Sequence, residues 1–352
     1  MTAWRSAPAA AHVERLTLRW LGEFVGFDKD AAGIMVGGGS AANLTALLAA
    51  IRTRSSPDAD RRRLAVYVSS EAHFSIAKAA GALGLVVRRI EADAEWRLDP
   101  DAVAAAIAQD ERERITPLCL VASAGTTSTG AIDPLEPLAG LAETHGLWFH
   151  VDGAYGAPAA AVERQASRFR GMERADSLAI DAHKWLYAPV DCSALLVHDT
   201  ATTARAFGAA ADDYVRVLGG QDEEAFAFWD HGLELSRRFR ALKLWMTLRH
   251  YGATRLADAI EHDIAMAARL GELVRQAADL ELTSPPSLSI CTFRHTGADN
   301  ERVLAVLQRD GRVYLSNAVI RGELALRACI TNFRTTEADI ERTVAVVREL
   351  AR

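Results

Sequence analysis

Three short segments of the sequence carry side chains that could do chemistry, each after an apolar run. Lys184 follows the run DSLAID, Asp152 ends the run LWFHVD, and the segment GGGS at 37–40 follows the run GIMV. A lysine in a partly dry cleft has a lowered pKa and can form a Schiff base. An aspartate can pair with a protonated ring nitrogen, and a glycine-rich turn before a helix can bind a phosphate group.

Each segment taken alone also has an ordinary structural interpretation. The three glycines could form a turn that leads into a helix, with Ser40 as its N-cap. Asp152 could be a turn residue, and a lysine such as Lys184 is usually solvated. The glycine segment matches neither common nucleotide-binding glycine motif in full, so a nucleotide is not implied.

The apolar runs alternate with longer helical patterns along the first two thirds of the chain. The runs are GIMVG, LAVYVSS, LGLVVRRI, PLCLVASA, GLWFHVD, DSLAID and CSALLVH. This alternation predicts an α/β fold with a mainly parallel, seven-stranded sheet covered by helices. An amphipathic helix is expected over 9–25, and the pairs Asp99-Pro100 and Asp133-Pro134 mark two further helix starts. An acid at the carboxyl end of a strand lies where such sheets bind ligands.

The pattern changes after residue 198. Residues 208–232 are rich in glycine and acidic residues, which predicts a long, mobile active-site loop. Helices are expected from about 236 to 250 and from about 254 to 278, and the remainder is typical of a β-α-β-β-α unit. We therefore expect a large domain over 1–240 and a small C-terminal α+β domain over 241–352.

Composition excludes several classes of function. The chain has 352 residues and a net charge of −6, so it offers no basic field for nucleic acid. Its four cysteines lie far apart without metal-binding spacing, and no apolar run is long enough to span a membrane. The N-terminus has no signal-peptide pattern. These features favour a cytoplasmic protein with no metal site and no membrane or nucleic-acid partner.

The three chemical segments together have the arrangement needed to hold pyridoxal 5′-phosphate (PLP), with a loop for the phosphate, an anion for the ring nitrogen and an amine for the aldehyde. The segments GGGSAANLTALLAA, HVDGAYG, DAHKWL and SRRFRALKLW resemble those of the group II PLP-dependent amino-acid decarboxylases, which act on aromatic amino acids, histidine or glutamate. The resemblance extends from about residue 5 to the C-terminus. It implies a fold-type I PLP-dependent transferase fold and a homodimer. The implied reaction converts an L-amino acid to the amine through an external aldimine and a quinonoid intermediate.

The resemblance also implies roles for individual residues. Lys184 would form the Schiff base, Asp152 would pair with the pyridinium, and His73 would stack on the ring, although His73 could simply open a helix. Ser193 could belong to a buried strand, and Arg327 resembles a family arginine that we interpret as structural. The implied cofactor-binding set is Gly38, Gly39, Ser40, His73, Thr127, Asp152, Ala154, His183 and Lys184.

Return of a proton to Cα, after carbon dioxide leaves, is the step with the least support from the sequence. Relatives often use a tyrosine on a mobile loop, and counting back without gaps from SRRF puts Phe228 at its position. Tyr214 and His231 are the candidate replacement donors. The expected catalytic set is therefore Lys184, His73, Asp152, His231 and Tyr214.

Three alternatives remain open on the sequence alone. If no donor serves, the carbanion could react with oxygen, giving decarboxylation with oxidative deamination to an aldehyde. Another PLP lyase would look alike at this level, and a catalytically silent homologue is a further possibility.

Relatives also carry an N-terminal segment before WRSAPAAAHVE that clasps the partner subunit, so we expect its absence to affect the dimer and the substrate pocket.

Overall fold

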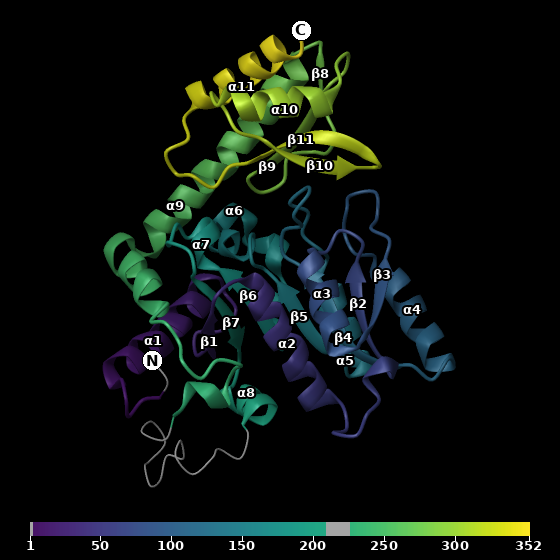
Figure 1. The fold of residues 1–352 in the computed structure, drawn as a ribbon, viewed down its shortest axis with the longest axis vertical. Helices are drawn as coiled ribbons and strands as arrows, with labels where there is room; N and C mark the ends of the chain where they lie inside the picture. Colours follow the sequence, from purple (N-terminus) through teal and green to yellow (C-terminus); the bar gives the residue numbers. More distant parts are fainter. Residues whose placement is uncertain (1–2, 209–225) are drawn as a thin grey trace.

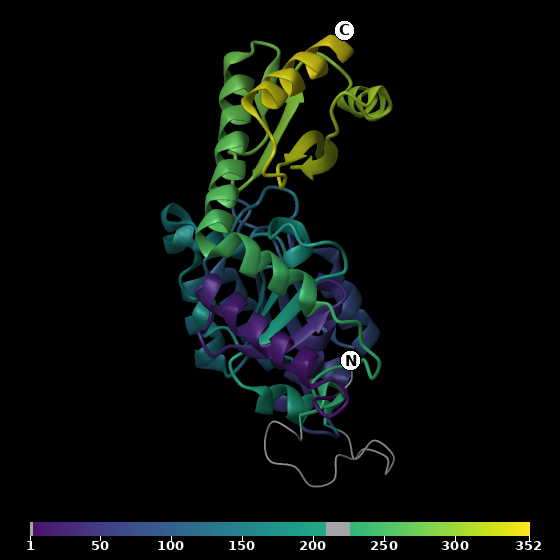
Figure 2. The ribbon, with the colours of Figure 1, turned by 90° about the vertical axis from the view of Figure 1, so that its left-hand side faces the viewer.

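The computed structural model describes residues 3–208 and 226–352. Its elements form a larger unit around a seven-stranded sheet and a smaller unit around a four-stranded sheet. The long helix α9 (Ala241–Gln276) runs from the larger unit into the smaller one (Figure 1). The turned view in Figure 2 places the smaller unit beside the C-terminal half of α9, at one end of the molecule.

The large sheet has the strand order β1-β7-β6-β5-β4-β2-β3, and β7 runs antiparallel to both of its neighbours. The other neighbouring pairs are parallel, so the predicted mainly parallel sheet is confirmed. All seven apolar runs form its strands, which are β1 (Ala32–Val36), β2 (Leu64–Ser69), β3 (Val86–Ile90), β4 (Thr116–Ser123), β5 (Trp148–Asp152), β6 (Ser177–Asp181) and β7 (Ser193–Val197).

Helices cover both faces of this sheet, which explains why its central strands are apolar throughout. Leu120 and Ala122 of β4 belong to one hydrophobic core, whereas the alternate residues Cys119 and Val121 belong to another on the opposite face. The helices of this unit are α1 (Pro8–Phe24), α2 (Gly39–Arg54), α3 (Phe74–Leu83), α4 (Pro100–Arg112), α5 (Leu135–His145), α6 (Glu163–Ala166), α7 (Ala182–Trp185) and α8 (Thr200–Phe207).

Both Asp-Pro pairs lie at helix starts, as predicted, but the two aspartates differ in role. Asp99 caps α4 and accepts a hydrogen bond from the backbone N–H of Asp101. Asp133 does not cap α5; its carboxylate accepts from the N–H groups of Leu98 and Ser123, both at 2.7 Å. Burial raises the pKa of Asp133 to about 6 despite these two donors.

The smaller unit has the predicted order of elements with one strand added. These elements are β8 (Leu280–Leu282), β9 (Ile290–His295), α10 (Asn300–Asp310), β10 (Ser316–Ile320), β11 (Glu323–Cys329) and α11 (Glu337–Leu350). The expected break between two helices occurs inside α9 at Gly252, whose φ of 76° is not helical. Leu244 and Ile260 of α9 pack into the large core and Met266 into the small one. The domain boundary at 240/241 stays a prediction, because α9 contributes to both cores.

The described end of the expected mobile loop is packed rather than exposed. The backbone N–H of Trp4 donates to the carbonyl of Phe226 at 3.0 Å, and Ala227 forms a bridge with Ala3. Phe228 is fully buried. The rest of the expected loop, including Tyr214, lies outside the described residues.

None of the helices within 3–208 and 226–352 is long and apolar enough to cross a membrane. All four cysteines fall in these ranges and are free thiols.

Candidate active site

A cavity of about 270 Å³ opens at the carboxyl edge of the large sheet. Its walls come from the segments that follow β1, β2, β4, β5 and β6, since these parallel strands all end at that edge. The segment before the antiparallel β7 closes it. The lining includes every member of the predicted cofactor-binding set, namely Gly38, Gly39, Ser40, His73, Thr127, Asp152, Ala154, His183 and Lys184.

Lys184 lies on α7, one short turn after β6, and its ammonium group contacts a buried carboxylate. Lys184 Nζ is 2.8 Å from Asp181 Oδ2, and the lysine side chain is 40% exposed. The cleft around Lys184 is therefore open to solvent rather than dry in this structure. Asp181 Oδ1 is buried and has no hydrogen-bond partner among the described residues. Sequence reasoning missed Asp181, although a spacing of three residues in DAHK signals a contact on one helical turn.

The glycine segment forms the entry to α2. Gly38 is the N-cap and α2 begins at Gly39, so the expectation that Ser40 caps this helix is wrong. Ser40 is instead in the first turn, where backbone N–H groups lack carbonyl partners within the helix and can bind an anion. A Cβ on Gly39 would lie 3.1 Å from Asp181 Oδ2 and 3.2 Å from Ala154 Cβ, so the backbone approaches that wall closely only because Gly39 has no side chain.

Asp152 ends β5 and is 9% exposed at the cavity wall. Its Oδ1 accepts a hydrogen bond from the backbone N–H of Ala154 at 3.2 Å, and its Oδ2 accepts from Asn43 Nδ2 at 2.9 Å. Asn43 was also missed by sequence reasoning. Its only signal is a polar residue among the apolar positions of an otherwise alanine- and leucine-rich helix.

His73 opens α3 and lines the cavity at the same time. Its Nδ1 accepts from the backbone N–H of Ser75 at 3.3 Å, as an N-cap does, and lies 2.7 Å from Ser75 Oγ. Burial lowers the pKa of His73, although Asp152 acts in the opposite direction. The capping role expected for an ordinary histidine is therefore present together with a position in the cavity.

His183 is held from the side of β7. Its Nδ1 lies 3.1 Å from the carbonyl oxygen and 3.2 Å from the backbone nitrogen of Cys192, and Ser193 Oγ is 3.3 Å away. Its Nε2 is 3.8 Å from Asp181 Oδ2. Ser193 is fully buried in β7 and is not among the residues that line the cavity. Its hydroxyl reaches the site through His183, and its backbone pairs with that of Asp181 in the sheet.

The turn that carries Lys184 is tied to α9 by two hydrogen bonds on its far side. Trp185 Nε1 and Tyr187 Oη donate to Asp263 Oδ2 at 3.0 Å and 2.9 Å. Tyr155, which also lines the cavity, stacks on Trp185 with ring centres 5.0 Å apart. Trp185 and Tyr187 therefore hold α7, the short helix that carries Lys184, in place.

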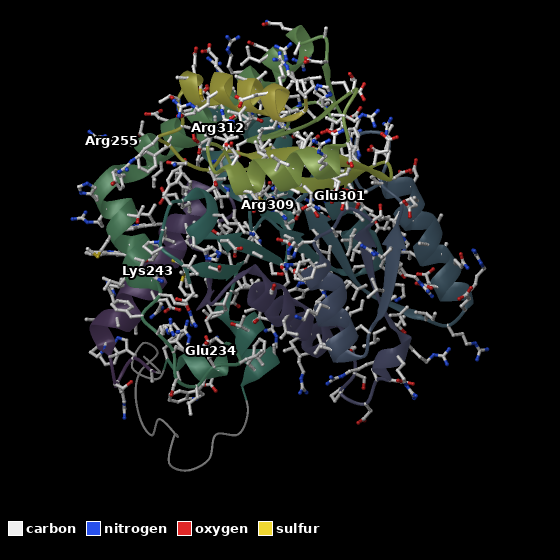
Figure 3. All side chains as sticks on the ribbon, turned by 45° about the horizontal axis from the view of Figure 1, so that its top comes forward. Glu234, Lys243, Arg255, Glu301, Arg309 and Arg312 are labelled. Carbon is white, nitrogen blue, oxygen red and sulfur yellow. The ribbon has the colours of Figure 1, made fainter. Side chains whose placement is uncertain are left out.

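An ion network fixes the cavity mouth beside Val190. Arg240 Nε lies 3.0 Å from Asp191 Oδ2, and Lys243 Nζ donates to the Asp191 carbonyl at 2.8 Å. Burial alone would raise the pKa of Asp191, but hydrogen bonds from Arg240 and Lys243 lower it to about 2. Arg240 also forms an ion pair with Glu234. Glu234 and Lys243, two members of this network, are labelled in Figure 3. Val190 itself is 77% exposed.

A packed region outside the cavity lining holds Phe228, the residue counted to the position of the family tyrosine, and His231, one of the two candidate donors. Phe228 is fully buried, with the Arg237 guanidinium 4.3 Å above its ring, so counting without gaps did not locate a mobile donor. His231 is 7% exposed, its Nδ1 is 2.8 Å from Thr203 Oγ1 of α8, and it stacks on Phe226. Figure 1 places α8 at the end of the large unit away from the small one. The structure does not bring His231 to the cavity of its own chain.

Arg327 is also absent from the cavity lining. It lies on β11 and its Nη1 donates to Ser316 Oγ of β10 at 3.2 Å. This contact within the small sheet agrees with the structural interpretation.

The residues of the cavity fit pyridoxal 5′-phosphate. The first turn of α2, which begins at Gly39, offers backbone N–H groups without helical partners to a phosphate group. Asp152 offers an acceptor, Lys184 an amine, and Asp181 Oδ1 is a buried polar atom that still lacks a donor. No group of three or more His, Cys, Asp or Glu side chains in the described ranges is arranged to hold a metal ion.

Comparisons with known proteins agree with this chemistry. The pyridoxal-dependent decarboxylase conserved domain matches residues 1–296. An aromatic-L-amino-acid decarboxylase of Bacillus atrophaeus is 34% identical over 99% of this chain and 75% of its own length. A phenylacetaldehyde synthase of Petunia hybrida is 31% identical over 99% of this chain and 74% of its own.

The solved structures extend the match to three dimensions. The Oryza sativa TDC with PLP and tryptamine superimposes with a TM-score of 0.92 at 28% identity, covering 99% of this chain and 77% of that one. The resemblance inferred from the sequence motifs and the expected fold are thereby confirmed. The chain belongs to the pyridoxal-dependent decarboxylase family and is a PLP-dependent amino-acid carboxy-lyase.

Proposed function

We propose that the cavity at the carboxyl edge of the large sheet is the active site, and that it converts an L-amino acid to the amine with release of carbon dioxide. One observation carries this proposal. An amine, an acceptor carboxylate, a histidine and a helix N-terminus, from four separate parts of the chain, line one cavity. When bound, PLP supplies a protonated ring that accepts the electron pair left when the bond from Cα to the carboxylate breaks.

The residues that line the cavity would each have a separate role in binding the cofactor. Lys184 Nζ would be the amine that holds the cofactor through its aldehyde group. The first turn of α2, at 39–41, binds the phosphate with Ser40, and His183 supports this side of the site. Asp152 holds the proton on the ring nitrogen, which keeps the ring a strong electron acceptor. Ala154 and His73 occupy the walls against which the ring packs.

Return of a proton to Cα needs a positioned acid and exclusion of water. Of the two predicted donors, His231 has its Nδ1 engaged by Thr203 and its ring stacked on Phe226. Tyr214 lies outside the described residues. The packing of His231 makes Tyr214 the stronger candidate.

The aldehyde-forming reaction is a second candidate function. It is favoured by the 31% identity to a phenylacetaldehyde synthase. In that reaction molecular oxygen would accept the electron pair and one water molecule would supply the carbonyl oxygen, and the products would be an aldehyde, carbon dioxide, ammonia and hydrogen peroxide.

Product analysis separates the two candidates. The PLP-loaded enzyme would be incubated with aromatic, acidic and basic L-amino acids, with histidine included, while carbon dioxide, amine, aldehyde and peroxide are measured together. We expect carbon dioxide and amine in equal amounts from one class of substrate. Aldehyde and hydrogen peroxide in equal amounts would show that the enzyme catalyses the second candidate, the aldehyde-forming reaction. No carbon dioxide from any member of the panel would contradict both.

We also propose that the enzyme is a cytoplasmic homodimer. Two exposed apolar side chains support an assembly that would cover them: Val190, which lines the cavity, is 77% exposed, and Phe74, which contacts the ring of His73, is 67% exposed. Light scattering coupled to gel filtration should give about twice the mass of one chain. A monomer at micromolar concentration would contradict this part of the proposal.

A further inference from the structure

Asn43 is a buried amide whose polar atoms are all engaged. It lies on α2 and is 1% exposed. Its Nδ2 is 2.9 Å from Asp152 Oδ2 and 3.0 Å from Ser75 Oγ, and its Oδ1 is 2.9 Å from His150 Nε2. A carboxylate oxygen without a proton can only accept, so the NH₂ group must face Asp152 and the carbonyl oxygen must face His150.

The orientation of Asn43 determines the protons behind it. His150 Nε2 must carry a proton, because Asn43 Oδ1 only accepts. Burial lowers the pKa of His150 to about 4, against the effect of the nearby Asp152, so the neutral ring has no second proton. His150 Nδ1 therefore accepts from Ser177 Oγ at 2.8 Å rather than donating to the Ser177 carbonyl at 3.2 Å. Trp148 Nε1, which only donates, completes the series at 2.9 Å from Ser177 Oγ.

The same amide reaches a second group on the cavity wall. Since Ser75 Oγ accepts from Asn43, the hydroxyl proton of Ser75 is free to point to His73 Nδ1, 2.7 Å away. The backbone N–H of Ser75 donates to the same nitrogen. The series of hydrogen bonds begins at Trp148 Nε1 and ends at the backbone N–H of Ser75, and both of these groups can only donate. The positions of the protons in between agree with a donor at each end.

The chain of hydrogen bonds lies out of solvent along most of its length. Trp148 is 2% exposed, Ser75 is 2% exposed, and His150 and Ser177 are fully buried. Water therefore does not compete for these groups, and each unmade hydrogen bond would leave a costly buried polar atom. The arrangement is stiff because every member has its partner.

We propose that Asn43 is a positioning residue for Asp152, held in one orientation by the buried series His150, Ser177 and Trp148, so that the Asp152 carboxylate faces the cavity as an acceptor. This inference rests on the proposed function, in which Asp152 pairs with the pyridine nitrogen of PLP. Asn43 lies within the motif GGGSAANLTALLAA and lines the cavity, but no role was predicted for it there; we assign it an effect on the cofactor through Asp152, which its Nδ2 contacts.

The experiment compares variants of the whole enzyme by a spectroscopic signature and by cofactor affinity. Asn43→Leu removes the amide, and Asn43→Asp keeps the size and the acceptor for His150 but removes both donors. Thr45→Val is the matched control, because Thr45 is 2% exposed on the same helix and its hydroxyl bonds only to the Ala41 carbonyl. Asp152→Asn is the reference for loss of the ring-nitrogen partner. The readouts are the ¹⁵N resonance of ring-labelled PLP, the ¹⁵N resonances of His150, and the dissociation constant of PLP.

We expect both Asn43 variants to shift the ring-nitrogen resonance toward that of Asp152→Asn and to weaken PLP binding by about tenfold. His150 should show a single proton on Nε2 in the wild type. Thr45→Val should leave the resonance unchanged and the PLP affinity within about twofold of wild type.

The outcomes separate the two levels of inference. If Asp152→Asn shifts the ring nitrogen and both Asn43 variants leave it and the affinity unchanged, the role of Asn43 is overturned while that of Asp152 stands. If Asp152→Asn itself matches the wild type, the proposed function of Asp152 fails first. Should Asn43→Leu not fold, the isosteric Asn43→Asp decides the result. A proton on His150 Nδ1 in the wild type would also overturn the orientation assigned to Asn43.

Discussion

His73 lies at the wall of the cavity and His231 lies in a packed cluster, and the sequence around the two histidines does not predict this difference. Both were expected to be catalytic, both are at least half-buried, and burial lowers the pKa of each. His73 opens a helix at the cavity, with Nδ1 turned to Ser75 and the ring beside open space. His231 has its ring between Thr203 and Phe226 in a packed cluster.

The burial of a histidine therefore does not distinguish an active site from a packed core. In the cavity, polar groups from several strand ends converge and some remain unpaired, such as Asp181 Oδ1. In the packed cluster, the Nδ1 of His231 is engaged by Thr203 Oγ1 and its ring stacks on Phe226. We therefore expect substitutions near the cavity to change the reaction with little loss of stability, and substitutions in the packed cluster to do the reverse.

Replacing the lysine should have the largest effect. Lys184→Ala removes the only amine that we assign to the cofactor, so activity and the borohydride-reducible adduct should both be lost. The folded state should persist, because the Lys184 side chain is 40% exposed. Absorbance, reduction with borohydride and peptide mapping would check this. An adduct that still forms in the variant would remove Lys184 from its role.

Asp152→Asn should come next. The neutral amide cannot hold the ring nitrogen protonated as a carboxylate does, so we expect the rate to fall on the order of a hundredfold or more. The size of the side chain is unchanged, so circular dichroism and the melting temperature should stay close to wild type. Wild-type turnover with intact structure would show that the carboxylate is not needed.

Tyr214→Phe tests the donor that lies outside the described residues. If Tyr214 returns the proton, its loss should lower amine formation and raise the share of aldehyde and peroxide, because the electron pair then has more time to react with oxygen. Product ratios under air and under nitrogen would measure this. An unchanged amine yield would return His231 to consideration.

The pair of substitutions His231→Gln and His73→Asn compares the packed cluster with the cavity directly. His73→Asn keeps a residue that can cap the helix. We expect His231→Gln to lower the free energy of unfolding by about 1–3 kcal/mol, through the lost hydrogen bond to Thr203 Oγ1 and the lost stacking on Phe226, with turnover unchanged. His73→Asn should lower turnover while leaving stability within about 1 kcal/mol. Urea titrations and steady-state kinetics on both variants would decide. The reverse pattern would contradict the comparison.

The pH dependence of stability should be the smallest separable effect. Burial lowers the pKa of His231 from 6.5 to about 4, with the positive charges of Arg15 and Arg237 acting in the same direction. The folded protein therefore favours the neutral ring, and the stability that this provides is complete above pH 6.5 and is lost as the pH falls toward 4. For one group the loss would be at most about 3 kcal/mol. His231→Gln should flatten the unfolding free energy across this window, and an unchanged slope would refute the assignment.

The architecture and most of the cavity could be predicted from the residue pattern alone. Apolar runs buried on both faces can only be strands between two helical layers, and the edge at which parallel strands end follows from their common direction. The positions of Lys184, Asp152 and the segment 37–40 could therefore be placed together before any coordinates. His73 was found only through the family motif, because a histidine that caps a helix looks the same in sequence.

The hydrogen-bond partner of each of these groups depends on packing between segments that are distant in the sequence. Asn43 and Asp152 are 109 residues apart, and His150 reaches Asn43 across 107 residues, so no local pattern could pair them. The packing of Phe228 and His231 depends on where α8 and Arg237 lie, and counting along a loop carries no information about that. Hydrogen bonds have direction and short range, whereas sequence patterns record only which face of an element is apolar, and this is why the fold was predictable while the proton arrangement was not.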